Sequence, residues 1–170
     1  MKKLFATAFM LLGLAFNSQA QEKNAIGLRL GDNDGFGAEV SYQRWLSKTN
    51  RLEADLGWRN INNGRYNNHF NAAKLVGIYQ WVWDIDNGFK WYAGPGAGVG
   101  VWRYNDNVND VSDSGSFLVL AGDIGIEYNF DFPLQLSLDF RPEIYFSDDY
   151  DDINDGNFGP DFGLSARYRF

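Results

Sequence analysis

The sequence predicts an all-β protein folded as an eight-stranded, antiparallel, up-and-down β-barrel. Three observations support this fold class. Eight segments alternate between apolar residues and polar or small residues, which is the period of a β-strand with two different faces. Turn and loop sequences separate these segments, and no stretch has helical periodicity of useful length. Aromatic residues (17% of the chain) and 19 glycines form a combination more typical of barrels than of helical bundles.

Residues 1–20 are expected to be a signal peptide that is cleaved after Ala20. Lys2 and Lys3 precede an apolar run, and Ser18-Gln19-Ala20 is a small-x-small cleavage pattern. The apolar run is shorter than the roughly 20 residues that a membrane-spanning helix needs. Residues 21–170 are then expected to form one barrel domain.

The composition excludes several classes of protein. The chain has no cysteine, which rules out a disulfide scaffold and a thiolate metal site. Without Lys2 and Lys3 it has 13 basic and 22 acidic residues, a net charge of −9. An acidic chain without a basic stripe is a poor candidate for binding nucleic acid.

The first three strand candidates are residues 25–31, 36–43 and 51–59, which follow one another as a meander. Asp34-Gly35 is a hairpin turn signal between the first two. A polar turn, residues 47–50, joins the second to the third, and an Asn-rich loop, residues 60–71, follows.

The fourth candidate, residues 72–83, fits the alternation least well. Leu75, Tyr79, Trp81 and Trp83 take the apolar side, but Val76 and Ile78 share the side of Lys74 and Gln80. The facing of this strand therefore stays open.

The fifth candidate, residues 89–103, follows the tight turn Asp86-Asn87-Gly88. Its small face carries Gly94, Gly96, Gly98 and Gly100. Pro95 here and Pro142 in the seventh candidate would each leave a sheet position without a donor, and the sequence gives no reason for either.

The last three candidates are residues 117–128, 134–146 and 161–170. A polar loop, residues 105–116, precedes the first of them, and an acidic loop, residues 147–157, precedes the last. The eighth strand ends in Tyr168-Arg169-Phe170, with both aromatics on its apolar face. Short and long connections thus fall at opposite ends of the barrel.

Alternation alone does not decide which face meets water, because a soluble lipocalin-type barrel alternates too. The glycine ladder of the fifth strand favours an inward polar face, since long Arg and Glu side chains need space inside a narrow barrel. Two belts of aromatics, separated by aliphatic residues, match the two interfaces of a membrane. One belt lies by the short turns and the other, Trp58, Tyr104, Phe117, Phe146 and Phe158, lies by the long loops. The prediction is a transmembrane barrel.

The chain combines a signal peptide, eight alternating strands, short turns opposite long loops, and the terminal aromatics Tyr168 and Phe170. In these features it resembles the small outer-membrane β-barrels of OmpX and OmpA-barrel type. This resemblance implies a location in the outer membrane of a Gram-negative envelope, as a multi-pass barrel. It also implies that Tyr168 and Phe170 form part of the signal read by the barrel-assembly machinery.

The charged residues on the polar faces are expected to form a mutually satisfied network that fills the lumen, because an unpaired buried charge is costly. Lys74 and Asp161 share these faces. The predicted network comprises Arg29, Glu39, Glu53, Asp55, Arg59, Asp123, Glu127, Asp139, Arg141, Glu143, Arg167 and Arg169. Eight strands leave room for side chains and little else, which favours structural packing over a conducting pore.

Neither a metal site nor an active site is predicted. The acidic loop lacks the alternating ligands of an EF-hand, since Ile153 interrupts them and no closing Glu follows. His69 is the single histidine, and its loop contains no serine. A nucleophile would have to come from Ser112, Ser114, Ser116 or Ser147.

The sequence therefore predicts a monomeric, non-enzymatic outer-membrane barrel with a structural or surface-interaction role through its long loops. Its expected partners are outer-membrane lipid and lipopolysaccharide, the barrel-assembly machinery and an unidentified extracellular partner, without a cofactor. Two alternatives stay open: a lipid A-modifying barrel enzyme and a secreted lipocalin-like binder.

Overall fold

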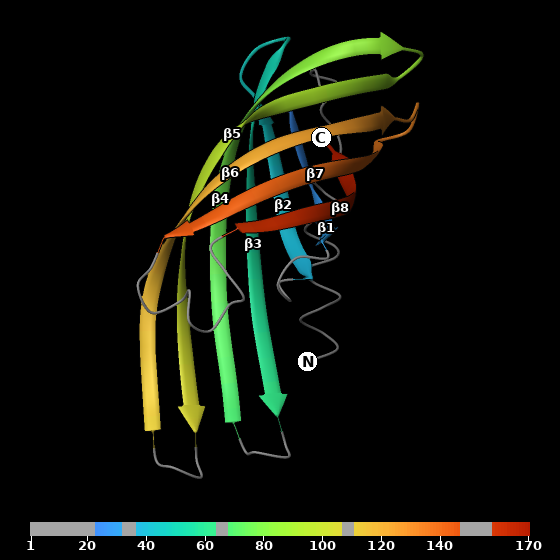
Figure 1. The fold of residues 1–170 in the computed structure, drawn as a ribbon. Coiled ribbons are helices and arrows are strands. Elements are labelled where there is room, and N and C mark those ends of the chain that lie inside the picture. The colour runs from blue at the N-terminus through green and yellow to red at the C-terminus, as the bar shows by residue number, and fades with distance from the viewer. Residues whose placement is uncertain (1–22, 32–36, 64–67, 107–110, 147–157) are drawn as a thin grey trace, which may run out of the picture.

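A computed structural model describes residues 23–31, 37–63, 68–106, 111–146 and 158–170 (Figure 1). Eight antiparallel strands form one closed barrel, and each strand pairs with its neighbours in the sequence. The strands are β1 (Asn24–Gly31), β2 (Ala38–Trp45), β3 (Asn50–Asn63), β4 (Asn68–Asp86), β5 (Phe89–Asp106), β6 (Val111–Asn129), β7 (Leu134–Phe146) and β8 (Phe158–Arg169). The predicted fold class is confirmed. Within the described part of the chain, no helix is long and apolar enough to cross a membrane.

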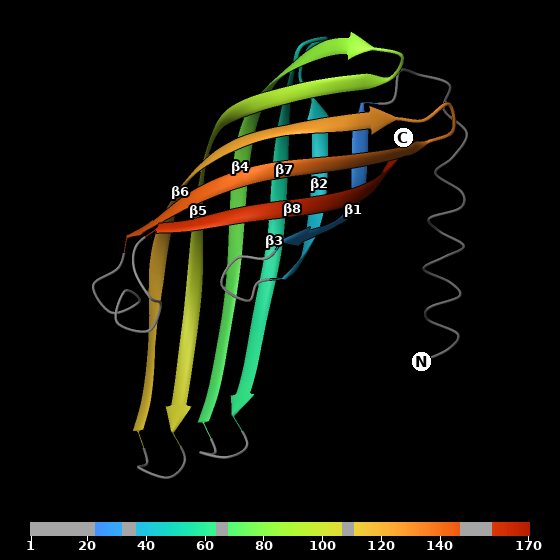
Figure 2. The ribbon, with the colours of Figure 1, turned by 45° about the vertical axis from the view of Figure 1, so that its right-hand side comes forward.

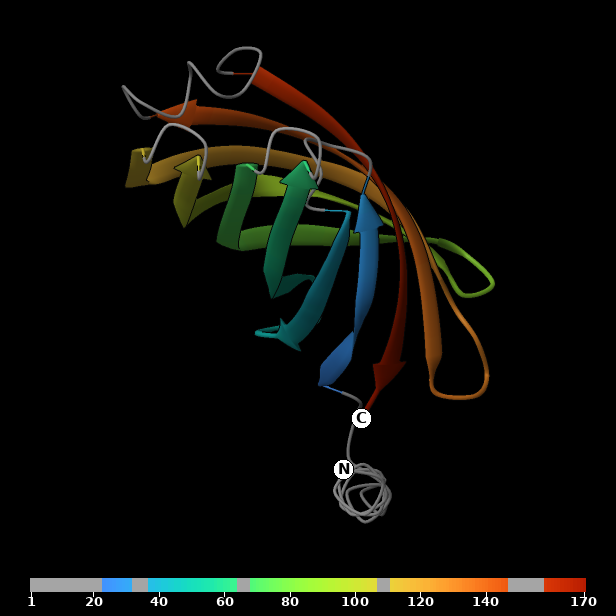
Figure 3. The same ribbon diagram turned by 90° about the horizontal axis from the view of Figure 1, so that it is seen from below.

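The barrel closes between its first and last strands. β1 and β8 lie side by side (Figure 3), with Ile26 opposite Tyr168 and Leu30 opposite Leu164. Asn24 and Phe170 exchange two backbone hydrogen bonds, of 3.0 and 2.8 Å. No sheet edge remains open along this seam, as closure of a barrel requires.

Four strands extend well beyond their predicted loop ends, and β8 begins at Phe158, three residues before its predicted start. β3 continues to Asn63 and β4 begins at Asn68, so much of the expected Asn-rich loop is a strand pair. β5 and β6 likewise extend into the expected loop of residues 105–116, up to the pair Asp106 and Val111. The loop ends of β3–β6 consequently reach well beyond the ends of the other strands (Figures 1 and 2). The expected loop of residues 147–157 lies outside the described residues.

The strands turn their apolar faces outward and their polar faces inward, as in a membrane barrel. A lipocalin has the opposite arrangement. On β7, Leu138 is 53% exposed and the next residue, Asp139, is 3% exposed. Around the barrel, large aliphatic side chains cover the outside, while arginines, aspartates and glutamates of β1–β3 and β6–β8 are buried inside. β4 contributes the buried Lys74 and Gln80, and the buried side chains of β5 are the aromatics Tyr92 and Trp102. The apolar band on the outside is the surface that a bilayer requires.

β4 follows strict alternation after all. Val76 and Ile78 are fully buried in the lumen beside Lys74 and Gln80, while Leu75 and Trp81 face outward. The pattern was hard to interpret because two lumen positions are apolar, and they pack with Ala121 of β6.

The aromatic belt at the loop end is smaller than expected. Trp58, Phe146 and Phe158 are exposed on the outside, but Phe117 is 2% exposed and belongs to the interior. Tyr104 also packs against an interior cluster. Both predictions were wrong because Phe117 shares its face with Val119 and Ala121, and Tyr104 shares its face with Trp102.

Three prolines form one row around the outside of the barrel. Pro95 pairs with Gly122, a Cβ on Gly122 would lie 3.5 Å from the Pro142 ring, and Pro142 pairs with Pro160. The β4–β5 and β6–β7 ladders both skip residues at this level. Because proline has no backbone N–H to donate, gathering the prolines in one row confines the interruption to one level of the barrel.

The hairpin turn between β4 and β5 also follows from its sequence. Asn87 and Gly88 both have positive φ, 47° and 87°. A two-residue turn with both residues in this region matches the twist of the flanking strands, and Asn-Gly is its preferred sequence.

Candidate functional site: the charged lumen

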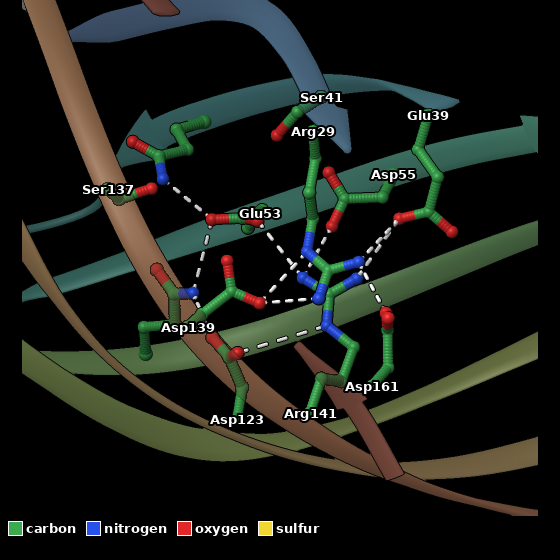
Figure 4. A network of polar contacts seen from close by, with 12 residues as sticks. Arg29, Glu39, Ser41, Glu53, Asp55, Asp123, Ser137, Asp139, Arg141 and Asp161 are labelled. Carbon is green, nitrogen blue, oxygen red and sulfur yellow. Dashed lines mark hydrogen bonds and ion pairs between the residues drawn. The ribbon is translucent and has the colours of Figure 1, made fainter. Parts of the chain in front are cut away.

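Arg141 of β7 is the centre of the polar interior. Its guanidinium lies 2.7 Å from Asp55, 3.2 Å from Glu53 and 3.5 Å from Glu39, and its Nε lies 3.8 Å from Asp123. These carboxylates come from β2, β3 and β6, so one side chain connects strands from several sides of the barrel (Figure 4). All five side chains are buried.

Arg29 of β1 forms a second centre beside it (Figure 4). Its Nε and Nη2 donate to Asp139, and its Nη1 lies 2.5 Å from Asp161 and 3.2 Å from Glu39. A Cβ on Gly163 would lie 2.5 Å from this guanidinium. Gly163 therefore provides the space in which Arg29 lies.

The glycines on β5 make room for other groups than the sequence analysis predicts. A Cβ on Gly94 would meet the backbone oxygen of Tyr79 at 1.7 Å, and one on Gly100 would meet the Phe117 ring at 2.0 Å. The ladder thus gives room to the β4 backbone and to an interior aromatic. The prediction that it accommodates arginine and glutamate side chains was wrong for these positions.

Arg167 of β8 binds Glu53 from the other side, at 2.8 Å, and also donates to the hydroxyls of Ser41 and Ser137. Glu53 accepts further bonds from Gln43 at 2.6 Å and from Gln80 at 3.1 Å. This carboxylate is therefore satisfied by several donors, as a buried charge must be.

Arg51 is the lumen residue that the sequence analysis missed. It is fully buried, its Nη1 lies 2.5 Å from Glu127, and its guanidinium lies over the Tyr92 ring at 4.7 Å. Alternation contains the signal, because Arg51 stands two residues before Glu53 and so shares its face. Its place directly after a polar turn made it look like the edge of the strand.

Lys74 completes the network near the loop end. Its ammonium group lies 2.7 Å from Glu143, which also accepts a hydrogen bond from the Tyr145 hydroxyl, and 3.5 Å from Glu39. The described network then has five cations (Arg29, Arg51, Lys74, Arg141 and Arg167) and eight carboxylates (Glu39, Glu53, Asp55, Asp123, Glu127, Asp139, Glu143 and Asp161). Arg29, Lys74 and Arg141 are each shared by two or more acids, whereas Arg51 and Arg167 each pair with one.

Two predicted members lie elsewhere. Arg59 has its guanidinium 5.5 Å from the Phe70 ring, towards the loop end. Arg169 lies at the turn end, where it donates to the backbone oxygens of Phe130 and Phe132. The other predicted residues all lie in the lumen network. Tyr168 and Phe170 stack at the closing seam, with ring centroids 6.5 Å apart, and their recognition by the assembly machinery stays a prediction.

Towards the loop end, the lumen becomes apolar. The cluster consists of Phe70, Ala72, Trp102, Phe117, Val119 and Tyr145, with Tyr104 packed against it. It lies on the inner face of the long strands β4, β5 and β6 together with β7. The lumen therefore has a charged layer in its middle and an aromatic layer nearer the loop end.

The described residues contain no cluster of His, Asp and Glu that could hold a metal ion. His69 of β4 stands opposite Asn105 of β5, which in turn stands opposite Ser112 of β6. One whole strand thus separates His69 from Ser112, about 10 Å between backbones at the usual strand spacing. Ser147 lies outside the described residues.

No protein-family model matches the chain, and no curated protein sequence matches it. Solved structures do match. Ail, the attachment invasion locus protein of Yersinia pestis, is 16% identical, with 86% of this chain and 96% of Ail covered and a TM-score of 0.58. Neisserial surface protein A, NspA, is 10% identical, with 86% and 94% covered and a TM-score of 0.58.

A major outer membrane protein from Thermus thermophilus is 15% identical, with 87% of this chain and 98% of that chain covered, and has a TM-score of 0.64. At these identities, the likeness concerns the fold. Together with the apolar outside and the charged inside, it confirms the predicted architecture and location. The chain has the fold of the small eight-stranded outer-membrane β-barrels.

Proposed function

We propose that this protein is a monomeric, non-conducting outer-membrane barrel that acts as a surface-interaction protein through its loop end. The observation that carries the proposal is the position of Arg141, whose guanidinium lies within 4 Å of carboxylates from three other strands. Side chains that meet across the lumen leave little room for a water-filled path.

The aromatic layer supports the same conclusion. Trp102, Phe117 and Tyr145 are each at most 3% exposed and fill the lumen on the loop side of the charges. A selective pore would instead show an open row of charges of one sign. Two successive layers of different chemistry favour a closed lumen.

The long strands support a role outside the membrane. Trp58, Ala73 and Val101 stand in one outward row, and the next row contains Asn60, Asn71 and Arg103. The change from apolar to polar on the outward face marks the place where the strands leave the bilayer. Beyond this row, β3–β6 present a sheet to the extracellular side, and Arg103 lies where a lipopolysaccharide headgroup would meet it.

The charge of the loop segments suggests which partner this sheet would bind. One of the matched Ail structures is a complex with the heparin analogue sucrose octasulfate. In this chain, residues 147–157 alone contain five aspartates, which would repel a sulfated chain. We therefore propose a basic partner for this protein.

The alternatives are weaker. A lipocalin-like binder needs an apolar interior and a polar outside, which is the reverse of the observed facing. A lipid A-modifying enzyme needs a base within hydrogen-bond reach of a nucleophile, whereas one strand separates His69 from Ser112. We propose that the protein has no catalytic activity.

Two measurements test the proposal. The refolded protein should give no large, stable conductance in a planar bilayer, and a porin-sized step would contradict the closed lumen. Cells that display it should adhere to a surface coated with polylysine and not to one coated with heparin. A variant in which the five aspartates of residues 147–157 are replaced by asparagine should lose the first adhesion. Preferential adhesion to heparin would contradict the proposed partner.

A further inference from the structure

The turn end of the lumen contains a cavity of about 590 Å³ whose charged lining, among the described residues, is entirely basic. Lys23, Lys48, Lys90 and Arg169 line it together with the Trp45 ring. This is unexpected in a chain with a net charge of −7. It also contrasts with the middle of the lumen, where every cation lies among carboxylates.

The barrel topology brings these four cations together from distant parts of the chain. Lys23 precedes β1, and its carbonyl accepts a hydrogen bond from the Trp45 amide at the end of β2. Arg169 stands opposite Ala25 at the closing seam. Lys90 comes from the start of β5, and Lys48 comes from the turn between β2 and β3. The cluster thus depends on the folded barrel.

The positive charge of the lysines is only partly neutralised. No ion pair in the described part of the chain joins Lys23 or Lys48 to a carboxylate. Lys90 pairs with Asp84, but the Asp84 side chain is 82% exposed and does not line the cavity. Arg169 donates to the backbone oxygens of Phe130 and Phe132, which orient its guanidinium.

Trp45 separates the cavity from the charged network. Its ring lies 5.7 Å from the Lys90 ammonium and 5.5 Å from the Arg51 guanidinium. Arg51 in turn pairs with Glu127. Glu127 is therefore already paired with a cation on the other side of Trp45.

We infer that this basic mouth is a binding site for a phosphate group presented from the periplasmic side. The short turns of outer-membrane barrels lie in the periplasm, and the cavity lies at that end. A concave site lined by charges of one sign concentrates counter-ions. Lysine ammonium groups with an arginine suit a phosphate, which offers several acceptor oxygens to their donors. The inference does not rest on the proposed surface-interaction role.

The phosphate could belong to a phospholipid headgroup of the inner leaflet or to a soluble periplasmic compound, and one probe distinguishes these sources. The indole N–H resonance of Trp45, assigned with Trp45→Phe, reports on the cavity by nuclear magnetic resonance. In zwitterionic micelles, inorganic phosphate titrated at constant ionic strength should shift this resonance if a soluble phosphate binds. In nanodiscs, phosphatidylglycerol in place of phosphatidylcholine should shift it if a headgroup binds.

Matched variants make the test specific. Lys48→Gln and Lys23→Gln should each weaken binding by roughly fivefold, the effect of one lysine near an anionic group. Arg44→Gln is the control, because Arg44 lies at the same end of the barrel but faces outward on β2. It should leave binding unchanged. The inference is overturned if neither probe shifts the Trp45 resonance, or if Arg44→Gln weakens binding as much as the lysine variants do.

Discussion

Arg141 and Asp55 meet across the barrel lumen, with Nη2 of the guanidinium 2.7 Å from Oδ2 of the carboxylate. Arg141 belongs to β7 and Asp55 to β3, and these strands are not neighbours in the sheet. Backbone ladders connect only adjacent strands, so contacts of this kind hold opposite walls together. The stability of the barrel should therefore depend on Arg141 more than on any single carboxylate around it.

Arg141→Ala should destabilise the folded barrel by about 3–5 kcal/mol, the usual effect of removing one partner of a buried ion pair. The loss removes the cation that Asp55 and Asp123 share, while Glu39 keeps Arg29 and Lys74. Unfolding by urea in lipid vesicles, followed by tryptophan fluorescence, measures the change.

Asp123→Asn is the matched control for that change. The Arg141 Nε lies 3.8 Å from Asp123, and the closer bond of Asp123 is accepted from Gln80, which an asparagine oxygen can also accept. Since the network has more carboxylates than cations, removing this charge should cost less than about 1 kcal/mol. An equal loss of stability in the two variants would contradict the role of Arg141 as the shared cation of the network.

Leu138→Arg should destabilise the protein by roughly 2–4 kcal/mol, the known cost of an arginine on the lipid face near the middle of the bilayer. Leu138 stands in an outward row between Ile126 and Leu164. Ile85→Arg is the control, because Ile85 is also exposed but lies at the turn end, where the cost falls to about 0–1 kcal/mol. Equal effects in the same urea assay would argue against a bilayer around the barrel.

Gly94→Ala should impair folding strongly, whereas Gly77→Ala should be tolerated. A methyl group on Gly94 would lie 1.7 Å from a backbone oxygen of β4, and the backbone cannot move away as a side chain can. The same group on Gly77 would find its nearest neighbour at 3.9 Å. We expect at least about 2 kcal/mol for Gly94→Ala and less than about 0.5 kcal/mol for Gly77→Ala. The folded fraction on an unheated denaturing gel checks this order.

His69→Ala should leave the acyl composition of lipid A unchanged, because no nucleophile in the described part of the chain lies within reach of this residue along its row. Mass spectrometry of lipid A from cells that express either form measures the composition. Loss of an acyl modification in the variant alone would support the alternative that the protein is a lipid A-modifying enzyme.

The sequence was sufficient to predict the number of strands and the facing of most of them, because alternation is a local property. The facing of residues 72–83 stayed open, since two of the lumen positions there are apolar. Residues 134–146 match β7 at both ends, and each polar residue there is buried. Strand lengths were less predictable. Polar residues such as Asn60 and Asn71 look like a loop, yet their backbones pair with each other and extend the sheet.

The partners within the lumen could not be predicted in the same way. Alternation places Arg141 inside but does not give its depth, which depends on the register of all eight strands. The same limit explains why Arg59 and Arg169, which lie towards the two ends of the barrel, were included in the network. The proline row is a further case, since Pro95, Pro142 and Pro160 become neighbours only when the register is known.

Single-cysteine labelling along β7 tests most directly whether the charged faces are inside. The native chain has no cysteine, so Leu136→Cys, Leu138→Cys, Gln135→Cys, Ser137→Cys and Asp139→Cys each carry one label site. In membranes, the two variants at leucine positions should react with a lipid-soluble maleimide, and the other three should react with neither that reagent nor a bulky water-soluble one. The opposite pattern, or free reaction of positions 135, 137 and 139 with the water-soluble reagent, would show that the polar face is outside and would contradict the membrane barrel.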